Sequence, residues 1–201
     1  MAYTLLTRER TGAVERVTLN RPEVRNAFNE ALVAELTAWA RATAGDAAVR
    51  ACVLAGAGKA FCAGADIGRM ARMVEYSEDD NRRDARALAA MFEALDTLPQ
   101  PLIGRVHGAA LGGGTGLAAV CDLVVASPEA AFGFTEVKLG ILPAVISPYC
   151  VAKIGAGHAR ALMLTGEKFD AARALRAGLV HEVVPAGDLD YRIPYGQAQI
   201  A

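Results

Sequence analysis

The sequence predicts a single α/β domain in which buried strands alternate with helices. Three observations support this prediction. Short apolar runs of strand length recur along the chain, segments with apolar residues at helical spacing lie between them, and glycine-rich loops join the two kinds of segment. The length of 201 residues suits one domain with a sizeable core, and apolar residues make up 53% of the chain.

The first part of the chain is expected to open with two strands and a helix. Residues 3–10 and 14–20 read as strands joined by a Thr-Gly turn. Asn29 is a candidate N-cap, because apolar residues recur behind it at helical spacing. These residues are Leu32, Val33, Leu36 and Trp39. The run 51–55 then predicts a buried strand.

The rest of the chain continues this alternation. A polar stretch, 69–83, is expected to be helical in part, and a long helix through 88–95 ends before Pro99. Residues 102–106 and 123–126 predict two more buried strands. Between them, a glycine loop at residues 108–116 leads into a short helix. The last helical segments are residues 148–154, 158–165 and 171–177, the third with Asp170 as cap and Gly178 as stop.

Composition argues against several classes of protein. The net charge is −1, from 21 basic and 22 acidic residues, so we expect neither a nucleic-acid partner nor a membrane partner. No apolar run reaches the length of a membrane-spanning helix and the N-terminus lacks a secretory pattern, so a cytoplasmic location is expected. The four cysteines, Cys62 among them, show no metal-binding spacing and are expected to be buried free thiols.

Two glycine loops carry the chemical signal, at residues 59–67 and 107–114. Each follows a buried strand and precedes a helix, where backbone N–H groups lack partners and the helix dipole is positive. Two such groups could converge on one oxygen as an oxyanion hole. Neither a Walker-type loop nor a dinucleotide-binding fingerprint is present. The plainer interpretation, that the glycines only permit tight turns, remains open at this point.

Four segments occur in the order and spacing of a known family. They are A-G-A-D-I at 63–67, H-G-A-A-L-G-G-G at 107–114, C-D-L at 121–123 and F-G-F-T-E-V-K-L-G at 132–140. The chain resembles the enoyl-CoA hydratase/isomerase (crotonase) superfamily from about residue 3 to 184. The resemblance implies a crotonase-like ββα spiral core over residues 1–185. Residues 186–201 would form an atypical short tail, with the family's C-terminal helical trimerisation region short or missing.

The resemblance also assigns roles to individual residues. Ala65 and Gly113 would donate their N–H groups to the thioester oxygen, and Glu136 would act as acid/base. Because Glu136 follows an apolar Phe-Gly-Phe stretch, a raised pKa is plausible. Arg25 would lie near the phosphates of coenzyme A. The other substrate-binding positions would be Ala27, Lys59, Ala63, Asp66 and Ile67.

The same resemblance describes the ligands and the assembly. Coenzyme A would enter as part of an acyl-CoA substrate, with no permanently bound cofactor and no metal. A homotrimer or a dimer of trimers is implied. One relative binds RNA through a lysine-rich helix, but residues 29–43 carry no basic stripe, so RNA binding is not expected.

Gly116 departs from the hydratase pattern, because a glutamate usually stands there. Three interpretations remain. The first is a hydratase that uses Glu136 alone, and the second is an enoyl-CoA isomerase with Glu136 as proton shuttle. The third is a non-catalytic CoA-thioester-binding protein. The segment L-P-A-V-I-S-P-Y at 142–149 resembles methylglutaconyl-CoA hydratases of leucine degradation, which makes 3-methylglutaconyl-CoA a candidate substrate.

Overall fold

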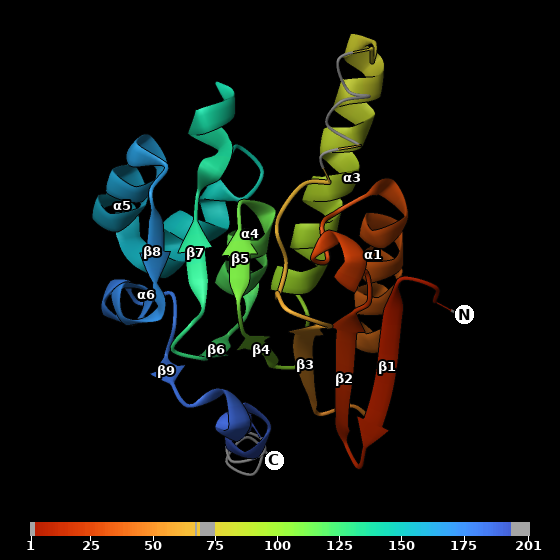
Figure 1. Cartoon of the computed structure of the whole chain (residues 1–201). Coiled ribbons are helices and arrows are strands. Elements are labelled where there is room, and N and C mark those ends of the chain that lie inside the picture. Colours follow the sequence, from red (N-terminus) through yellow and green to blue (C-terminus); the bar gives the residue numbers. More distant parts are fainter. Residues whose placement is uncertain (1–2, 67, 69–74, 194–201) are drawn as a thin grey trace.

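The computed structural model describes residues 3–66, 68 and 75–193, and confirms the α/β class. Figure 1 shows a larger sheet with helices on one side and a smaller sheet beyond one end of its strands. The larger sheet has the strand order β1-β2-β3-β4-β6-β9. Its strands are β1 Leu6–Thr11, β2 Val14–Leu19, β3 Ala51–Gly56, β4 Leu102–Val106, β6 Leu123–Ala126 and β9 Glu182–Val183.

Only the first pair of the larger sheet is antiparallel. β1 and β2 form the predicted hairpin, with Thr11 opposite Val14. All later pairs, from β2–β3 to β6–β9, are parallel. The parallel strands β3, β4 and β6 are almost entirely buried, which explains why they appear in the sequence as continuous apolar runs.

The smaller sheet brings the glycine loops together. It contains β5 Ala109–Leu111, β7 Ala131–Gly133 and β8 Lys168–Asp170. Two isolated parallel bridges extend the same pattern, Cys62 with Ala110 and Phe28 with Ala65. Strands of the larger sheet are thus followed by a short extended segment in this second layer and then by a helix. This is the ββα spiral that the family resemblance implied.

The helices cover one side of the larger sheet (Figure 1). They are α1 Glu30–Ala44, α3 Glu78–Asp96, α4 Gly113–Val120, α5 Ser147–Thr165 and α6 Ala171–Ala177, with short 3-10 helices η1 Pro22–Val24, η2 Thr135–Leu139 and η3 Ala186–Asp188. The predicted caps are confirmed. Asn29 Oδ1 accepts from Leu32 N at 2.8 Å, and Asp170 Oδ1 accepts from Arg173 N at 2.7 Å.

One predicted boundary was wrong. The loop expected over 108–116 is an ordered strand, β5, followed at once by α4, so that Gly113, Gly114 and Gly116 already lie in the helix. Glycine propensity pointed to a loop, but close packing against neighbouring backbone overrides it here. The two helical segments predicted at 148–154 and 158–165 are confirmed, because Gly155 has a non-helical conformation, φ 74° and ψ 158°, that divides α5 into two helices across a kink.

The opposite side of the larger sheet carries a smaller apolar cluster. Leu189 and Ile193 pack there against Val53, Ile103 and Val125. The chain is helical from residue 189 to 193, and Asp190 forms ion pairs with Arg16 and Arg105. The segment after β9 is therefore fixed to the sheet by both apolar and ionic contacts.

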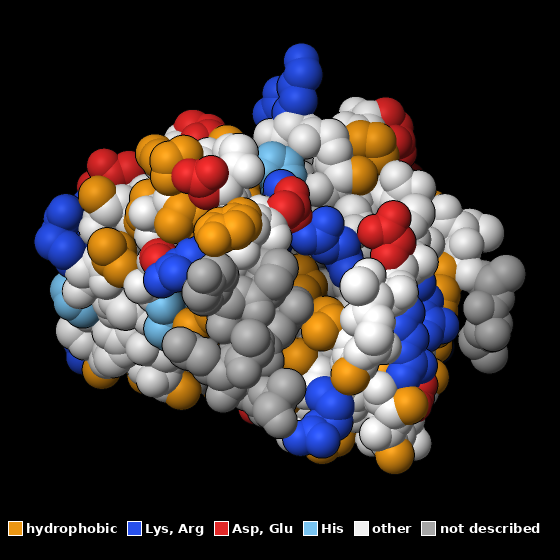
Figure 2. Space-filling model, turned by 90° about the horizontal axis from the view of Figure 1, so that it is seen from below, with side chains coloured by type: hydrophobic (Ala, Val, Ile, Leu, Met, Phe, Trp, Pro, Cys, Tyr) orange, Lys and Arg blue, Asp and Glu red, His pale blue; other side chains and the backbone are white. Residues whose placement is uncertain are grey.

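The distribution of charged residues and of cysteines matches what the composition indicated. Charged side chains of both signs and hydrophobic ones are interspersed on the face seen in Figure 2. All four cysteines are free and buried, as predicted. In the part of the chain that the structure describes, no helix combines the length and apolar character needed to cross a bilayer.

Candidate active site

The first glycine loop runs beside Phe28 and turns one backbone N–H group outward. Phe28 N donates to Gly64 O at 2.7 Å, and Asp66 N donates to Phe28 O at 3.0 Å. Successive groups of an extended chain point to opposite sides, so the N–H of Ala65 points away from Phe28. It donates to no described residue. Ala65 therefore offers a free backbone donor at an exposed position.

The second glycine loop offers an equivalent group at the start of α4. Gly113 is the first residue of this helix, and its N–H has no acceptor in the preceding turn. Gly112 N donates to Gly133 O at 2.8 Å and Gly116 N to Gly112 O at 3.1 Å, while the described residues provide no acceptor for Gly113 N. The positive end of the α4 dipole lies at the same place.

Gly64 and Gly113 bring the two donors together. A Cβ atom on Gly64 would lie 2.7 Å from the carbonyl oxygen of Leu111 and 3.6 Å from the backbone nitrogen of Gly113. The peptide before Ala65 thus packs directly on the peptide that carries the Gly113 N–H. Gly64 has a φ of +91°, so glycine is needed both for this backbone conformation and for the close approach.

Glu136 places a carboxylate close to the start of α4. It lies in η2, and its Oε1 would be 3.1 Å from a Cβ atom on Gly112. Burial raises the pKa of its carboxyl group, and Oε2 is buried without a hydrogen-bond partner among the described residues. A partly desolvated carboxylate is thus held beside the first turn of α4, where it is suited to accept and return a proton.

Gly116, where the hydratase pattern has a glutamate, faces Ile146. A Cβ atom on Gly116 would lie 2.9 Å from Ile146 Cβ, closer still to Ile146 Cγ2, and 3.1 Å from Phe92 Cε1. Real Cβ atoms do not approach other atoms at under 3.0 Å. The space for a side chain at position 116 is therefore filled, so glycine is the residue that this packing accommodates.

Aromatic rings continue the apolar wall beside this face of α4. Phe28 would collide with any side chain on Gly113, since a Cβ atom there would lie 2.5 Å from Phe28 Cε2. Phe28 packs edge-on against Phe92, with ring centroids 6.4 Å apart, and Phe92 stacks on Tyr149 at 5.8 Å. The sequence analysis did not identify this wall, because its residues come from distant segments and only the fold brings them together.

Asn26 fixes the segment that precedes Phe28 to the first glycine loop. Its side chain is fully buried, and Nδ2 donates to Ala57 O at 2.9 Å and to Ala60 O at 2.8 Å. Its Oδ1 accepts from Arg21 N at 2.9 Å. Both Arg25 and Asn26 have positive φ angles, of 54° and 57°. This tight turn sets the register between Phe28 and Ala65.

The other predicted binding residues are spread around the same loop. Arg25 and Lys59 are exposed, and neither side chain pairs with a described residue. Ala63 N donates to Arg25 O at 2.9 Å, so the loop runs alongside Arg25. Ala27 is buried at 6% exposure. Ile67 lies outside the described residues.

Asp66 has a structural partner. Its Oδ2 lies 3.0 Å from Arg21 Nη2, and its Oδ1 accepts from Gly68 N at 2.9 Å. The side chain therefore fixes the end of the loop. Asp122 behaves in the same way, since its Oδ2 accepts from Leu102 N at 2.7 Å. His107 also makes a structural contact, with its Nε2 2.8 Å from Gly58 O.

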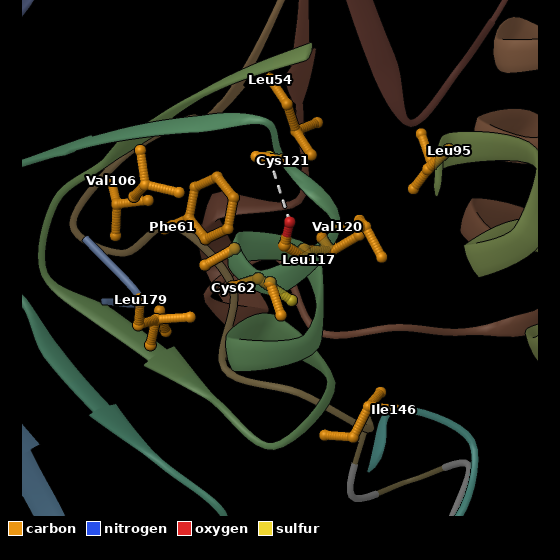
Figure 3. Packing of buried hydrophobic residues seen from close by; sticks show 14 of the residues in the cluster. Leu54, Phe61, Cys62, Leu95, Val106, Leu117, Val120, Cys121, Ile146 and Leu179 are labelled. Atoms are coloured by element: carbon orange, nitrogen blue, oxygen red, sulfur yellow. Dashed lines mark hydrogen bonds between the residues drawn. The ribbon is translucent and has the colours of Figure 1, made fainter. Parts of the chain in front are cut away.

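Thr115 and Cys62 are buried and have structural roles near the site. Thr115 is fully buried, its Oγ1 lies 2.7 Å from Ala110 O, and it accepts from Gly133 N at 3.2 Å. This hydroxyl ties β5 to β7. Cys62 is a buried free thiol, as predicted, and burial raises its pKa to about 12, so it is not suited to act as a nucleophile. Figure 3 shows Cys62 beside α4, together with Leu117 and Cys121.

A groove of about 860 Å³ lies elsewhere, between α1 and α3. It is lined by small and charged residues of those helices, and none of the candidate residues above belongs to it. Among the described residues, no cluster of histidine, cysteine and carboxylate groups has the composition of a metal site.

Known proteins share this sequence and fold. The family described as "Enoyl-CoA hydratase/isomerase" matches residues 9–193. A Rhizobium meliloti protein named "Probable enoyl-CoA hydratase" is 42% identical over 185 residues, which are 92% of this chain and 70% of that protein. The 2,3-dehydroadipyl-CoA hydratase of Escherichia coli is 38% identical over 172 residues, 85% of this chain and 65% of that protein.

Solved structures agree with these relatives. AtuE of Pseudomonas aeruginosa superposes with a TM-score of 0.95 at 44% identity, covering 98% of this chain and 77% of that one. An enoyl-CoA hydratase of Mycobacterium smegmatis gives a TM-score of 0.93 at 36% identity, covering 98% and 76%. The spiral core is thus shared along almost the whole of the present chain.

Proposed function

Because the chain belongs to the enoyl-CoA hydratase/isomerase family, we propose that it hydrates an α,β-unsaturated acyl-CoA thioester. The observation that carries this proposal is the position of Glu136. One partly buried carboxylate lies against the first turn of α4, beside the free N–H of Gly113 and the loop that holds Ala65. These are the parts needed to stabilise an enolate and to move a proton.

The backbone donors stabilise the charge that develops on the thioester oxygen. When water adds to the β-carbon, electron density moves to the carbonyl oxygen and forms an enolate. The N–H groups of Ala65 and Gly113 donate to that oxygen, and the loss of one such donor typically costs roughly 3–4 kcal/mol of transition-state stabilisation. The dipole of α4 adds partial positive charge at the same point.

Glu136 performs the proton transfer in this scheme. As a carboxylate it takes a proton from the attacking water, and as an acid it returns a proton to the α-carbon. Because burial raises its pKa, the protonated form that returns the proton is easier to reach than in a solvated glutamate. Since Gly116 supplies no second carboxylate, the same group serves both steps.

Exposed cations suit the coenzyme A part of the substrate. Arg25 and Lys59 flank the first glycine loop without a partner among the described residues, and phosphate groups would pair with them. The acyl group is proposed from the sequence alone. The segment at 142–149 suggests 3-methylglutaconyl-CoA, and the relative from Escherichia coli makes 2,3-dehydroadipyl-CoA a second candidate.

Isomerisation is the second candidate function, and one observation favours it. The described part of the site holds one carboxylate beside an apolar wall, and moving a proton between two carbons of an enoyl group needs one base and no attacking water. The oxyanion hole and Glu136 would serve this reaction without change.

Self-association is proposed as well, as a homotrimer or a dimer of trimers. Large apolar side chains are exposed shortly after Glu136 in the chain and near the end of α5, with Leu139 at 58%, Leu142 at 81% and Leu164 at 73% exposure. Val137 packs close to Gly166 at the end of α5, which brings these residues into one region. Apolar surface of this kind is typical of a contact between subunits. Sedimentation of the purified chain would measure its state.

The experiment that tests the function compares the wild type with Glu136→Gln. Crotonyl-CoA, 3-methylglutaconyl-CoA and 2,3-dehydroadipyl-CoA are offered in turn, and the loss of enoyl-thioester absorbance reports hydration. A 3-enoyl-CoA reports isomerisation by the gain of the same absorbance. We expect turnover to fall by at least about 100-fold in the variant, because a general acid/base is removed, while calorimetry shows retained binding of butyryl-CoA.

Two results would contradict the proposal. Equal turnover in both proteins would exclude Glu136 as the acid/base. Binding of butyryl-CoA without turnover of any enoyl-CoA by the wild type would leave a CoA-thioester-binding protein.

A further inference from the structure

The start of α4 presents two glycines to its surroundings. Gly112 is the N-cap of this helix, and Gly116 donates its N–H to the carbonyl oxygen of Gly112 at 3.1 Å. Glu136 packs against the first of them, and Ile146 packs against the second. A carboxylate therefore lies at the N-cap of α4, and an aliphatic side chain fills the space beside Gly116, four residues later.

Ile146 is held firmly in its place. It is 3% exposed and stands at the N-cap of α5, with its carbonyl oxygen accepting from Cys150 N at 3.0 Å. In Figure 3 it lies on the segment that leads into α5. The short approach to Gly116 involves its Cβ as well as Cγ2, so rotation of the side chain alone cannot clear the space.

Glu136 lies close to the first turn of α5. Cys150 lies one turn after Ile146, and the negative charge of Glu136 contributes, after burial, to raising the pKa of the Cys150 thiol. The side chains next to Gly116 are apolar, Ile146 and Phe92. A water molecule on that side finds hydrocarbon where a second carboxylate would have held it by a hydrogen bond.

We propose that Ile146 is a specificity-determining residue, which fills the place of a second acid/base group beside Gly116 and so limits the site to chemistry that one carboxylate can perform. The inference rests on the proposed function, since it assumes that Glu136 acts on an acyl-CoA thioester. It predicts that proton exchange at the α-carbon is fast relative to the addition of water. Both the glycine at 116 and the isoleucine at 146 must change before a second carboxylate can enter.

The test measures two reactions on the same proteins. Loss of crotonyl-CoA absorbance gives hydration, and deuterium uptake from D₂O into butyryl-CoA gives α-proton exchange, which needs the oxyanion hole and one base. The variants are Ile146→Ala, Gly116→Glu, and Gly116→Glu combined with Ile146→Ala. We expect the double variant to raise the ratio of hydration to exchange at least about tenfold over Ile146→Ala. An unchanged ratio in a folded double variant would overturn the proposal.

A second measurement keeps the packing claim testable if the double variant does not fold. Gly116→Ala adds only the Cβ atom, and it is made in the wild type and in Ile146→Ala. We expect it to lower the melting temperature markedly in the wild type and clearly less in the Ile146→Ala background. An equal loss in both backgrounds would show that Ile146 does not exclude side chains at position 116.

Failure of the proposed function gives a different result. If Glu136→Gln matched the wild type in both reactions, Glu136 would not be the acid/base, whatever the outcome at position 146. If Glu136→Gln abolished both reactions but the folded double variant gained no hydration, the function would stand and the role of Ile146 would be wrong.

Discussion

The carboxylate of Glu136 lies against Gly112, with Oε1 3.1 Å from the position of a Cβ atom on that glycine. Gly112 is the N-cap of α4 and has a φ of +52°. The chain therefore places an ionisable group and a helix N-terminus in contact without any side chain between them. Four predictions follow from this site and from the contacts that support it.

The first prediction concerns stability and pH. Burial raises the pKa of folded Glu136 above its ordinary value, so over the interval between the two values the folded protein binds more protons than the unfolded one. This contribution to stability is present below the ordinary pKa of glutamate and is lost as the pH rises through the folded pKa. Glu136→Gln should therefore gain stability relative to the wild type as the pH rises from about 4 to 8. Thermal unfolding at several pH values measures the difference, and a constant difference would contradict the assignment.

The second prediction separates backbone strain from close packing. Gly12 and Gly64 both have positive φ angles, but a Cβ atom on Gly12 meets nothing within 4 Å, while one on Gly64 would lie 2.7 Å from Leu111 O. Gly12→Ala should cost about 1–2 kcal/mol of stability and leave turnover unchanged. Gly64→Ala should cost more and also lower kcat, because it separates the two loops. Urea unfolding and crotonyl-CoA turnover test both variants, and equal effects would contradict the argument.

The third prediction concerns Asn26. Replacing it by alanine removes the donor to the carbonyl oxygens of the half-buried Ala57 and the buried Ala60, and it removes a side chain that tolerates positive φ. We expect a loss of roughly 2–3 kcal/mol in the free energy of unfolding. Asn26→Asp is the matched control, since it keeps the shape but turns a carboxylate toward the same carbonyl groups. Asn26→Asp should therefore be no more stable than Asn26→Ala. A stability close to wild type in either variant would refute this account.

The fourth prediction concerns the segment after β9. Arg105 and then Arg16 lower the pKa of Asp190 to about 2. A lowered pKa in the folded state gives stability that is present above the ordinary aspartate pKa and lost as the pH falls toward the folded value. Asp190→Asn should therefore unfold more easily than the wild type at pH 7, and the difference should shrink from about pH 4 downward. A difference that persists at pH 2 would point to packing rather than charge.

Sequence reasoning predicted the elements whose signals are local. Asn29 and Asp170 cap their helices as expected, and the apolar runs at β3, β4 and β6 are buried strands. Such signals depend on neighbours within a few residues. The short strands β7 and β8 were not predicted, because each has three residues and is held by pairing with distant segments.

The candidate site was predictable in part. The sequence indicated the two glycine loops and Glu136, and the structure shows Gly64 packed on Gly113 and Glu136 packed on Gly112. The meaning of Gly116 could not be read from the sequence. It depends on Ile146, thirty residues later, and no spacing rule connects these two positions. The same holds for Phe28 and Phe92, whose contact follows from the path of the spiral.

The two candidate donors belong to the main chain, one from each of two successive turns of the spiral. A substitution at position 65 changes the side chain but keeps the backbone N–H group. The hydrogen bond proposed for the thioester oxygen is therefore retained by most substitutions there. Variation can then act on the surrounding side chains, such as those at 116, 136 and 146. Proteins with this fold could evolve from one reaction to another while the same two backbone N–H groups continued to bind the thioester oxygen.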